Sequence, residues 1–88
     1  RAIIHACDIH DRVLVGMGAI IMDGAIIESD VLVAAGSIVT PGKRLHSGGL
    51  YRGSPAKRVR DLTPNEHDQL LYSSKHYFRL SSSHSQTE

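Results

Sequence analysis

The sequence predicts a mainly β fold, a solenoid of short strands wound from six-residue repeats and followed by one C-terminal α-helix. The main observation is a period of six, because Ile or Val stands at every sixth position for seven consecutive steps. A period of six is neither the 3.6 of a helix nor the 2 of a simple strand. Short fixed repeats of this kind are typical of β-solenoids, in which each repeat is one strand and one corner. The seven residues are Ile3, Ile9, Val15, Ile21, Ile27, Val33 and Val39.

A second position of the repeat predicts the corners. The third residue after each aliphatic residue is glycine in four repeats and Asp30 in a fifth. Glycine adopts a positive φ without a Cβ penalty, and Asp tolerates it better than most residues. Ala6 and Arg12 occupy this position in the first two repeats and depart from the rule. The fourth residue after each of the first six aliphatic residues is small or β-branched, as a narrow interior requires.

Composition limits the class of protein. A chain of 88 residues forms at most one small domain. The net charge of +1 gives no indication of a nucleic-acid or membrane partner, no apolar run is long enough to span a membrane, and the start lacks a signal-peptide pattern. We therefore expect a soluble, cytoplasmic protein. The single cysteine, Cys7, cannot form an internal disulfide, and its inward phase predicts a buried, unreactive thiol.

The chain divides into four predicted parts. Residues 1–44 form the coils, truncated at the N-terminal side, and residues 45–62 form a connecting segment rich in glycine and basic residues. Residues 63–80 are predicted to form a helix packed on the coils, because Thr63-Pro64-Asn65-Glu66 reads as a capping box with proline at the first helical position. The polar residues 81–88 are expected to be a disordered tail.

Hexapeptide solenoids with these motifs resemble left-handed parallel β-helices of triangular section. The resemblance implies three repeats per turn, so that each residue stacks on the residue three repeats further along the chain. Two of the three outer faces would then be apolar and one polar. Because extended apolar faces need cover, we expect the C-terminal helix to cover one and a neighbouring subunit to cover the other.

The run HACDIHDRVLVGMGA, together with LYRGSPAKRVRDL, resembles the C-terminal half of a gamma-class carbonic anhydrase-like protein of the compact bacterial branch. That family implies a homotrimer, here formed through an apolar face. It also implies zinc held at subunit boundaries by three histidines, two from one chain and one from its neighbour. The reaction implied is the reversible hydration of CO2 to bicarbonate.

The resemblance assigns two site residues. His5, in the segment His5-Ala6-Cys7, matches the last of the three zinc ligands, and Tyr77 matches a helix tyrosine near the metal and is a catalytic candidate. The other two histidines would fall before Arg1. We therefore expect a fragment of a longer protein that does not complete the zinc site alone and is inactive alone. Whether the parent protein is an active enzyme stays open at this point.

Two alternatives remain. One is a CoA-dependent hexapeptide acyltransferase, in which a basic cluster could meet a CoA phosphate; the uninterrupted repeats offer no protruding loop for its catalytic histidine. The basic cluster comprises Arg52, Lys57, Arg58 and Arg60. The other alternative is a trimerisation module without catalysis. Under any of these functions, His10, on the polar face, is expected to be solvated.

Overall fold

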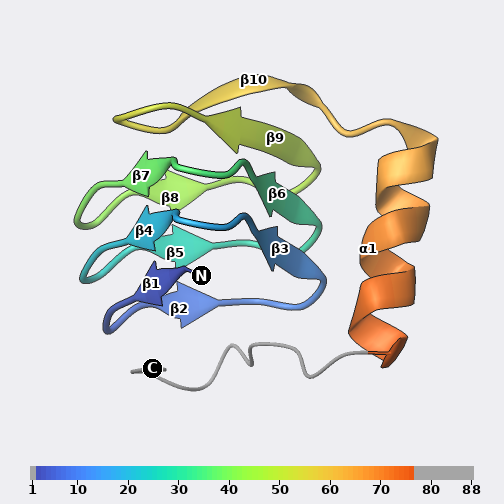
Figure 1. Ribbon diagram of the computed structural model, residues 1–88, viewed down its shortest axis with the longest axis horizontal. Helices are drawn as coiled ribbons and strands as arrows, with labels where there is room; N and C mark the ends of the chain where they lie inside the picture. The colour runs from blue at the N-terminus through green and yellow to red at the C-terminus, as the bar shows by residue number, and fades with distance from the viewer. Residues whose placement is uncertain (1, 77–88) are drawn as a thin grey trace.

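The computed structural model describes residues 2–76, with side chains over residues 2–73. Over these residues ten short strands precede one helix, so the fold is mainly β with a C-terminal helix, as predicted (Figure 1). Part of the predicted helix 63–80, and all of the predicted tail 81–88, lie outside the described residues. The elements are β1 (Ile3–Ile4), β2 (Asp8–Ile9), β3 (Val13–Val15), β4 (Ile20–Ile21), β5 (Ile26–Ile27), β6 (Val31–Val33), β7 (Ile38–Val39), β8 (Arg44–Leu45), β9 (Gly49–Arg52), β10 (Lys57–Asp61) and α1 (Pro64–His76).

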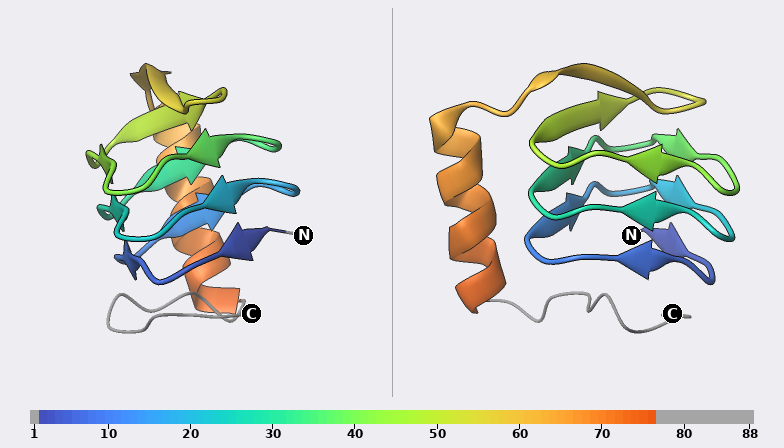
Figure 2. Two further views of the ribbon diagram at one scale, coloured as in Figure 1. Left: turned by 90° about the vertical axis from the view of Figure 1, so that its left-hand side faces the viewer. Right: turned by 180° about the vertical axis from the view of Figure 1, so that it is seen from behind.

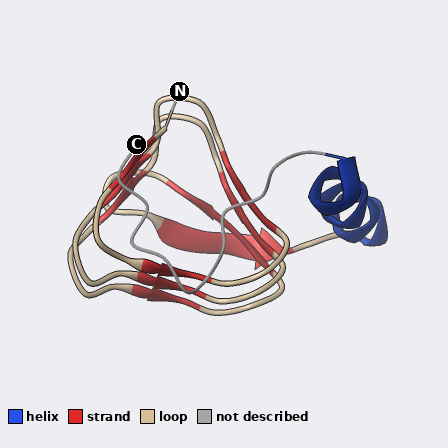
Figure 3. Cartoon of the chain, turned by 90° about the horizontal axis from the view of Figure 1, so that it is seen from below, coloured by secondary structure: helices blue, strands red, loops and turns tan. Residues whose placement is uncertain are grey.

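The strands form three sheets that the chain visits in turn, with the orders β1-β4-β7, β2-β5-β8 and β3-β6-β9-β10. Seen end-on, the three sheets enclose a triangular outline (Figure 3). Every pairing is parallel except that of β10 with β9, which is antiparallel. The parallel pairing continues through β9 and so enters the span 45–62, for which the sequence predicts a connecting segment.

The core consists of three columns of inward side chains, one behind each sheet. Successive members of a column are three six-residue repeats apart, except that Ile4 and Ile21 are one residue closer in the sequence. All are buried apart from Val15, which is half-buried and packs against the others. The period of six therefore predicts the core correctly over most of the chain, and it continues two steps beyond Val39. The columns are Ile4–Ile21–Val39, Ile9–Ile27–Leu45 and Val15–Val33–Tyr51.

The first repeat differs from the predicted phase. The period places Ile3 in the core, but Ile3 is 51% exposed and Ile4 is 8% exposed. Ile3 pairs with Ile20, whereas three full repeats would pair it with Ile21, so the first repeat is one residue shorter than the others. Because side chains alternate between the two faces of a strand, this shift of one residue exchanges the inward and outward positions.

Helix α1 lies beside the outer face of the sheet β3-β6-β9-β10 (Figure 2). Its N-terminus is a capping box, as predicted: the Glu66 amide donates to Thr63 Oγ1 at 3.2 Å, and the Thr63 amide donates to Glu66 Oε1 at 2.9 Å. Leu70 is buried, whereas Leu71 and Tyr72 are exposed. Neither α1 nor any other segment among residues 2–76 is a helix long and apolar enough to cross a membrane.

Candidate functional site

His5 follows strand β1 at the corner between the first two sheets. Its amide donates to the carbonyl of Ile21 at 2.9 Å, which joins the backbone to the next coil. The imidazole is 47% exposed, and its Nδ1 lies 3.8 Å from Oδ1 of Asp23. Together with Met22 and Pro41, these two residues line a shallow hollow of about 110 Å³.

The stacking of the coils explains why these residues meet. His5 and Met22 each follow an inward residue of the same column, Ile4 and Ile21, whose strands pair directly. Asp23 then occupies the corner beside His5. Asp23 was not predicted as a site residue from the sequence. The register of β1 with β4 aligns His5 with Met22, so that Asp23 is one residue beyond the aligned position.

The imidazole of His5 is open to solvent, and the charged residue beside it, Asp23, is acidic. Because Nδ1 is the ring nitrogen of His5 nearest to Asp23, Nε2 is left for another partner. Cys7, two residues further on, is half-buried. Burial, followed by the negative charges of Asp8 and Asp23, raises the pKa of the Cys7 thiol. A thiol of this kind stays protonated at neutral pH and is a poor metal ligand.

The second predicted site residue, Tyr77, lies outside the described residues. Among residues 2–76, no three His, Cys, Asp or Glu side chains converge on one point where a metal ion could be held.

Two other histidines lie on the polar sheet β2-β5-β8. His10 Nε2 lies 3.4 Å from Asp8 Oδ2, and His46 Nδ1 lies 3.4 Å from Glu28 Oε2. Each imidazole thus has a carboxylate neighbour on its own sheet. The predicted solvated role of His10 agrees with its partly exposed side chain.

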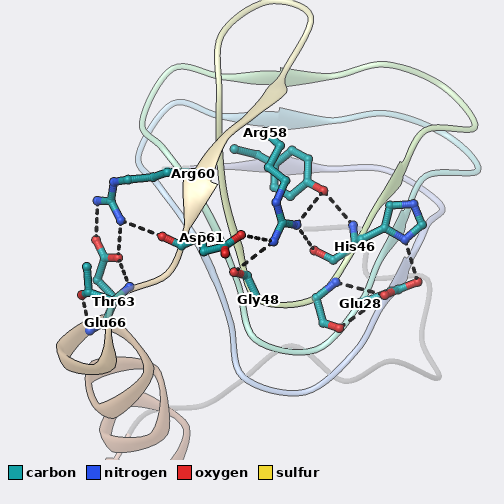
Figure 4. Close-up of polar contacts among 10 residues, drawn as sticks. Glu28, His46, Gly48, Arg58, Arg60, Asp61, Thr63 and Glu66 are labelled. Carbon is teal, nitrogen blue, oxygen red and sulfur yellow. Dashed lines mark hydrogen bonds and ion pairs between the residues drawn. The ribbon is translucent and has the colours of Figure 1, made fainter.

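The four basic residues of the predicted cluster differ in their contacts. Arg58 donates to the carboxylate of Asp61 at 2.8 Å and to the carbonyls of His46 and Gly48 (Figure 4). Arg60 forms a two-pronged ion pair with Glu66, at 2.7 and 2.8 Å. These two arginines thus hold β10 to the coils and to the start of α1.

The other two residues of that cluster, Arg52 and Lys57, are directly opposite each other in the β9–β10 pair. Like charges in this arrangement repel each other. The structure therefore divides the cluster into a structural pair and an outward-facing pair.

Known proteins similar to this chain include carbonic anhydrase-like and hexapeptide-repeat proteins. No protein-family model matches the chain. The chain is 42% identical to gamma carbonic anhydrase 2, mitochondrial, of Arabidopsis thaliana over 94% of its own length and 30% of that protein. It is 51% identical to protein YrdA of Escherichia coli over 90% of its own length and 43% of that protein.

A solved structure agrees with this relationship. A hexapeptide transferase family protein from Anaplasma phagocytophilum matches with a TM-score of 0.81 and 43% identity, over 84% of this chain and 45% of that one. The chain thus spans less than half the length of each of these proteins. The sequence resemblance is confirmed, and the chain is homologous to the gamma carbonic anhydrase-like hexapeptide-repeat proteins.

Proposed function

We propose that this chain is part of a cytoplasmic, left-handed β-helical protein that assembles as a homotrimer and binds zinc at a site shared between subunits. In this proposal the protein catalyses the reversible hydration of CO2, and His5 is one of the zinc ligands. The observation that supports it best is the exposed imidazole of His5 beside Asp23 at the edge of an outer face that also carries the exposed side chain of Ile3. The similarity to gamma carbonic anhydrase 2 supports the reaction.

The chemistry of His5 fits one position of a zinc site. Zinc takes neutral imidazole nitrogens as ligands, and a metal-bound imidazole usually has a carboxylate or carbonyl beside its other nitrogen. Asp23 is at ion-pair distance from Nδ1 and, with a small movement of either side chain, would orient the ring and leave Nε2 for the metal. When bound, zinc supplies the Lewis acidity that activates water at neutral pH.

The residues that the structure describes do not complete such a site. A catalytic zinc site needs three protein ligands and one open position, and within residues 2–76 no three His, Cys, Asp or Glu side chains converge on one point. The remaining ligands must come from other parts of the protein and from a neighbouring subunit. The role proposed for the described residues is to present and orient one ligand; Tyr77 is proposed to line the same site.

Metal analysis of the full-length protein tests this proposal. We expect purified wild-type protein to contain about one zinc per chain, and His5→Ala to lose most of it, because removing one of three protein ligands opens the site. His10→Ala is the matched control, since His10 also has a carboxylate neighbour but lies on another sheet. Equal zinc content in wild type and His5→Ala would refute the assignment of His5.

An acyltransferase is the second candidate, because a similar structure is named a hexapeptide transferase family protein. Its acyl donor would carry phosphates, and the outward pair Arg52 and Lys57 offers two positive charges. Assays of the full-length protein separate the two functions. Zinc-dependent CO2 hydration in stopped-flow measurements supports the first. Acetyl-CoA consumption that is lost in the Arg52→Ala, Lys57→Ala double variant supports the second.

A further inference from the structure

His5 and Asp23 lie on two adjacent coils whose backbones are joined on both sides of the contact. The His5 amide donates to the carbonyl of Ile21 at 2.9 Å, and the Gly24 amide donates to the carbonyl of Ala6 at 2.7 Å. Along the second coil, one of these hydrogen bonds comes before Asp23 and the other comes after it. The imidazole and the carboxylate therefore start from fixed backbone positions, and only their side-chain torsions bring them together or apart.

The carboxylate of Asp23 is available to His5. Its Oδ1 lies 3.8 Å from Nδ1 of His5, which is longer than a hydrogen bond, but the Asp23 side chain is 75% exposed and can rotate to close the gap. Among the side chains that the structure describes, no other histidine, lysine or arginine lies within ion-pair distance of this carboxylate. An ionised carboxylate only accepts hydrogen bonds, so it favours the form of the imidazole whose N–H faces it.

His10 provides a comparison within the same chain. Its Nε2, rather than its Nδ1, lies near a carboxylate oxygen, 3.4 Å from Oδ2 of Asp8. Its side chain is 37% exposed and that of His5 is 47% exposed, so the two imidazoles are similarly open to solvent. The two carboxylates thus favour opposite tautomers, with the proton on Nδ1 in His5 and on Nε2 in His10.

We infer that Asp23 is a positioning residue that fixes neutral His5 as its Nδ1–H tautomer, within one chain and before a metal or a neighbouring subunit is bound. This inference rests on the zinc site of the proposed function and specifies what determines the ligand atom there. A neutral imidazole has one ring nitrogen without a proton, and the partner of the other nitrogen decides which one it is. Asp23 therefore leaves Nε2 as the nitrogen of His5 that binds the metal, and acts through His5 without touching the metal itself.

The tautomer of His5 in metal-free, full-length protein is the direct test. Nitrogen-15 NMR of histidine-labelled protein distinguishes a protonated from an unprotonated ring nitrogen at about pH 8, where a histidine side chain is uncharged. Spectra of His5→Ala and His10→Ala assign the signals. We expect the proton on Nδ1 in His5 and on Nε2 in His10.

Variants of the two carboxylates separate a specific effect from a general one. In Asp23→Ala we expect a mixture of both His5 tautomers, because the acceptor that holds the proton on Nδ1 is gone. Asp23→Glu keeps a carboxylate and should restore the Nδ1–H form. Asp8→Ala is the matched control, since Asp8 lies beside the other imidazole, and it should leave His5 unchanged.

Zinc affinity gives a second measurement. Loss of the partner of a metal-bound imidazole weakens metal binding by about 10- to 100-fold. By competition with a chelator, we expect Asp23→Ala to bind zinc about 10-fold more weakly or worse, and Asp23→Glu to recover most of the loss. Asp8→Ala should bind zinc like the wild type. Circular dichroism checks that each variant is folded, and the wild-type tautomer decides the question if Asp23→Ala does not fold.

Two results would overturn the role of Asp23. One is wild-type protein with the His5 proton on Nε2. The other is an Asp23→Ala variant in which either the tautomer of His5 or the zinc affinity equals that of the wild type. Both can occur while zinc stays bound through His5, so the proposed function would survive them. A wild type that holds no zinc would instead refute the proposed function, and with it the metal-binding consequence of this inference.

Discussion

Arg12 and Asp30 occupy equivalent corners of adjacent coils and bind each other through two hydrogen bonds. Arg12 Nε donates to Asp30 Oδ1 at 2.7 Å, and an Nη atom donates to Oδ2 at 3.1 Å. Both residues have a positive φ, 55° for Arg12 and 59° for Asp30, at positions where other coils have glycine. Arg12 therefore departs from the corner rule in residue type but not in conformation, and the ion pair offsets the cost of placing two side-chain-bearing residues there.

Two substitutions of Arg12 should separate the effect of its ion pair with Asp30 from the effect of its positive φ. Arg12→Ala removes the ion pair but keeps a Cβ at positive φ, so we expect the free energy of unfolding to fall by about 1 kcal/mol, as for a partly exposed pair. Arg12→Gly removes the same pair but also relieves backbone strain of about 1 kcal/mol. It should therefore remain close to wild type in urea unfolding. A glycine variant less stable than the alanine variant would contradict this account.

The two isoleucines of β1 provide a direct test of the register. Ile4→Ser removes a core side chain that is 8% exposed, whereas Ile3→Ser changes a side chain that is 51% exposed. We expect Ile4→Ser to reduce the free energy of unfolding by about 2–4 kcal/mol and Ile3→Ser by less than about 1 kcal/mol. Both variants are compared by urea unfolding below the concentration at which subunits associate. If Ile3→Ser lost more stability than Ile4→Ser, the register that the six-residue period predicts would be correct and the observed one wrong.

These two positions also show how far sequence alone could predict the fold. The aliphatic period predicts the columns through Ile21 and Ile27 correctly. Each of these residues is buried in a narrow interior, which requires the same kind of side chain in every coil. The period fails at Ile3, since a repeat shortened by one residue leaves an aliphatic residue at both adjacent positions and composition cannot choose between them. It also ends at Val39, because Leu45 and Tyr51 keep their places in the columns but are not the Ile or Val that defines the period.

The candidate site was less predictable than the fold. His5 was identified by resemblance to a family, which carries information about the whole protein rather than about this segment. Asp23 was not identified, because its contact with His5 arises from the stacking of two coils. Its corner position alone gives no indication of function.

Gly16 should be more sensitive to substitution than Gly36, although only Gly36 has a positive φ. A Cβ on Gly16 would lie 2.4 Å from the backbone nitrogen of Ala35 in the next coil, whereas a Cβ on Gly36 meets nothing within 4 Å. The Ala35 backbone belongs to the stack and cannot move away without breaking coil pairing. We expect Gly36→Ala to reduce the free energy of unfolding by about 1–2 kcal/mol through strain, and Gly16→Ala to reduce it by more. Equal losses in thermal unfolding would contradict the close coil contact.

Glu28 should make stability depend on acid pH. Its carboxylate accepts hydrogen bonds from the Ser47 amide at 3.0 Å and from Arg44 Nε at 2.6 Å, and His46 lies beside it. The amide of Ser47, then Arg44, lower the pKa of Glu28 from its ordinary 4.5 to about 2. Because the folded-state pKa lies below the unfolded one, the stabilisation is fully present above pH 4.5 and is lost as the pH falls towards 2.

Glu28→Gln removes this titration. The difference in free energy of unfolding between wild type and Glu28→Gln should be constant between about pH 5 and pH 6 and should shrink steadily from pH 4.5 downwards. Arg44→Gln keeps the Ser47 amide but removes the second largest cause of the lowered pKa, so its own pH dependence should be confined to a narrower window just below pH 4.5. Urea unfolding at half-unit steps of pH measures all three proteins. A wild-type to Glu28→Gln difference that stays constant down to pH 3 would show that the Ser47 and Arg44 contacts do not hold the Glu28 carboxylate in its charged form.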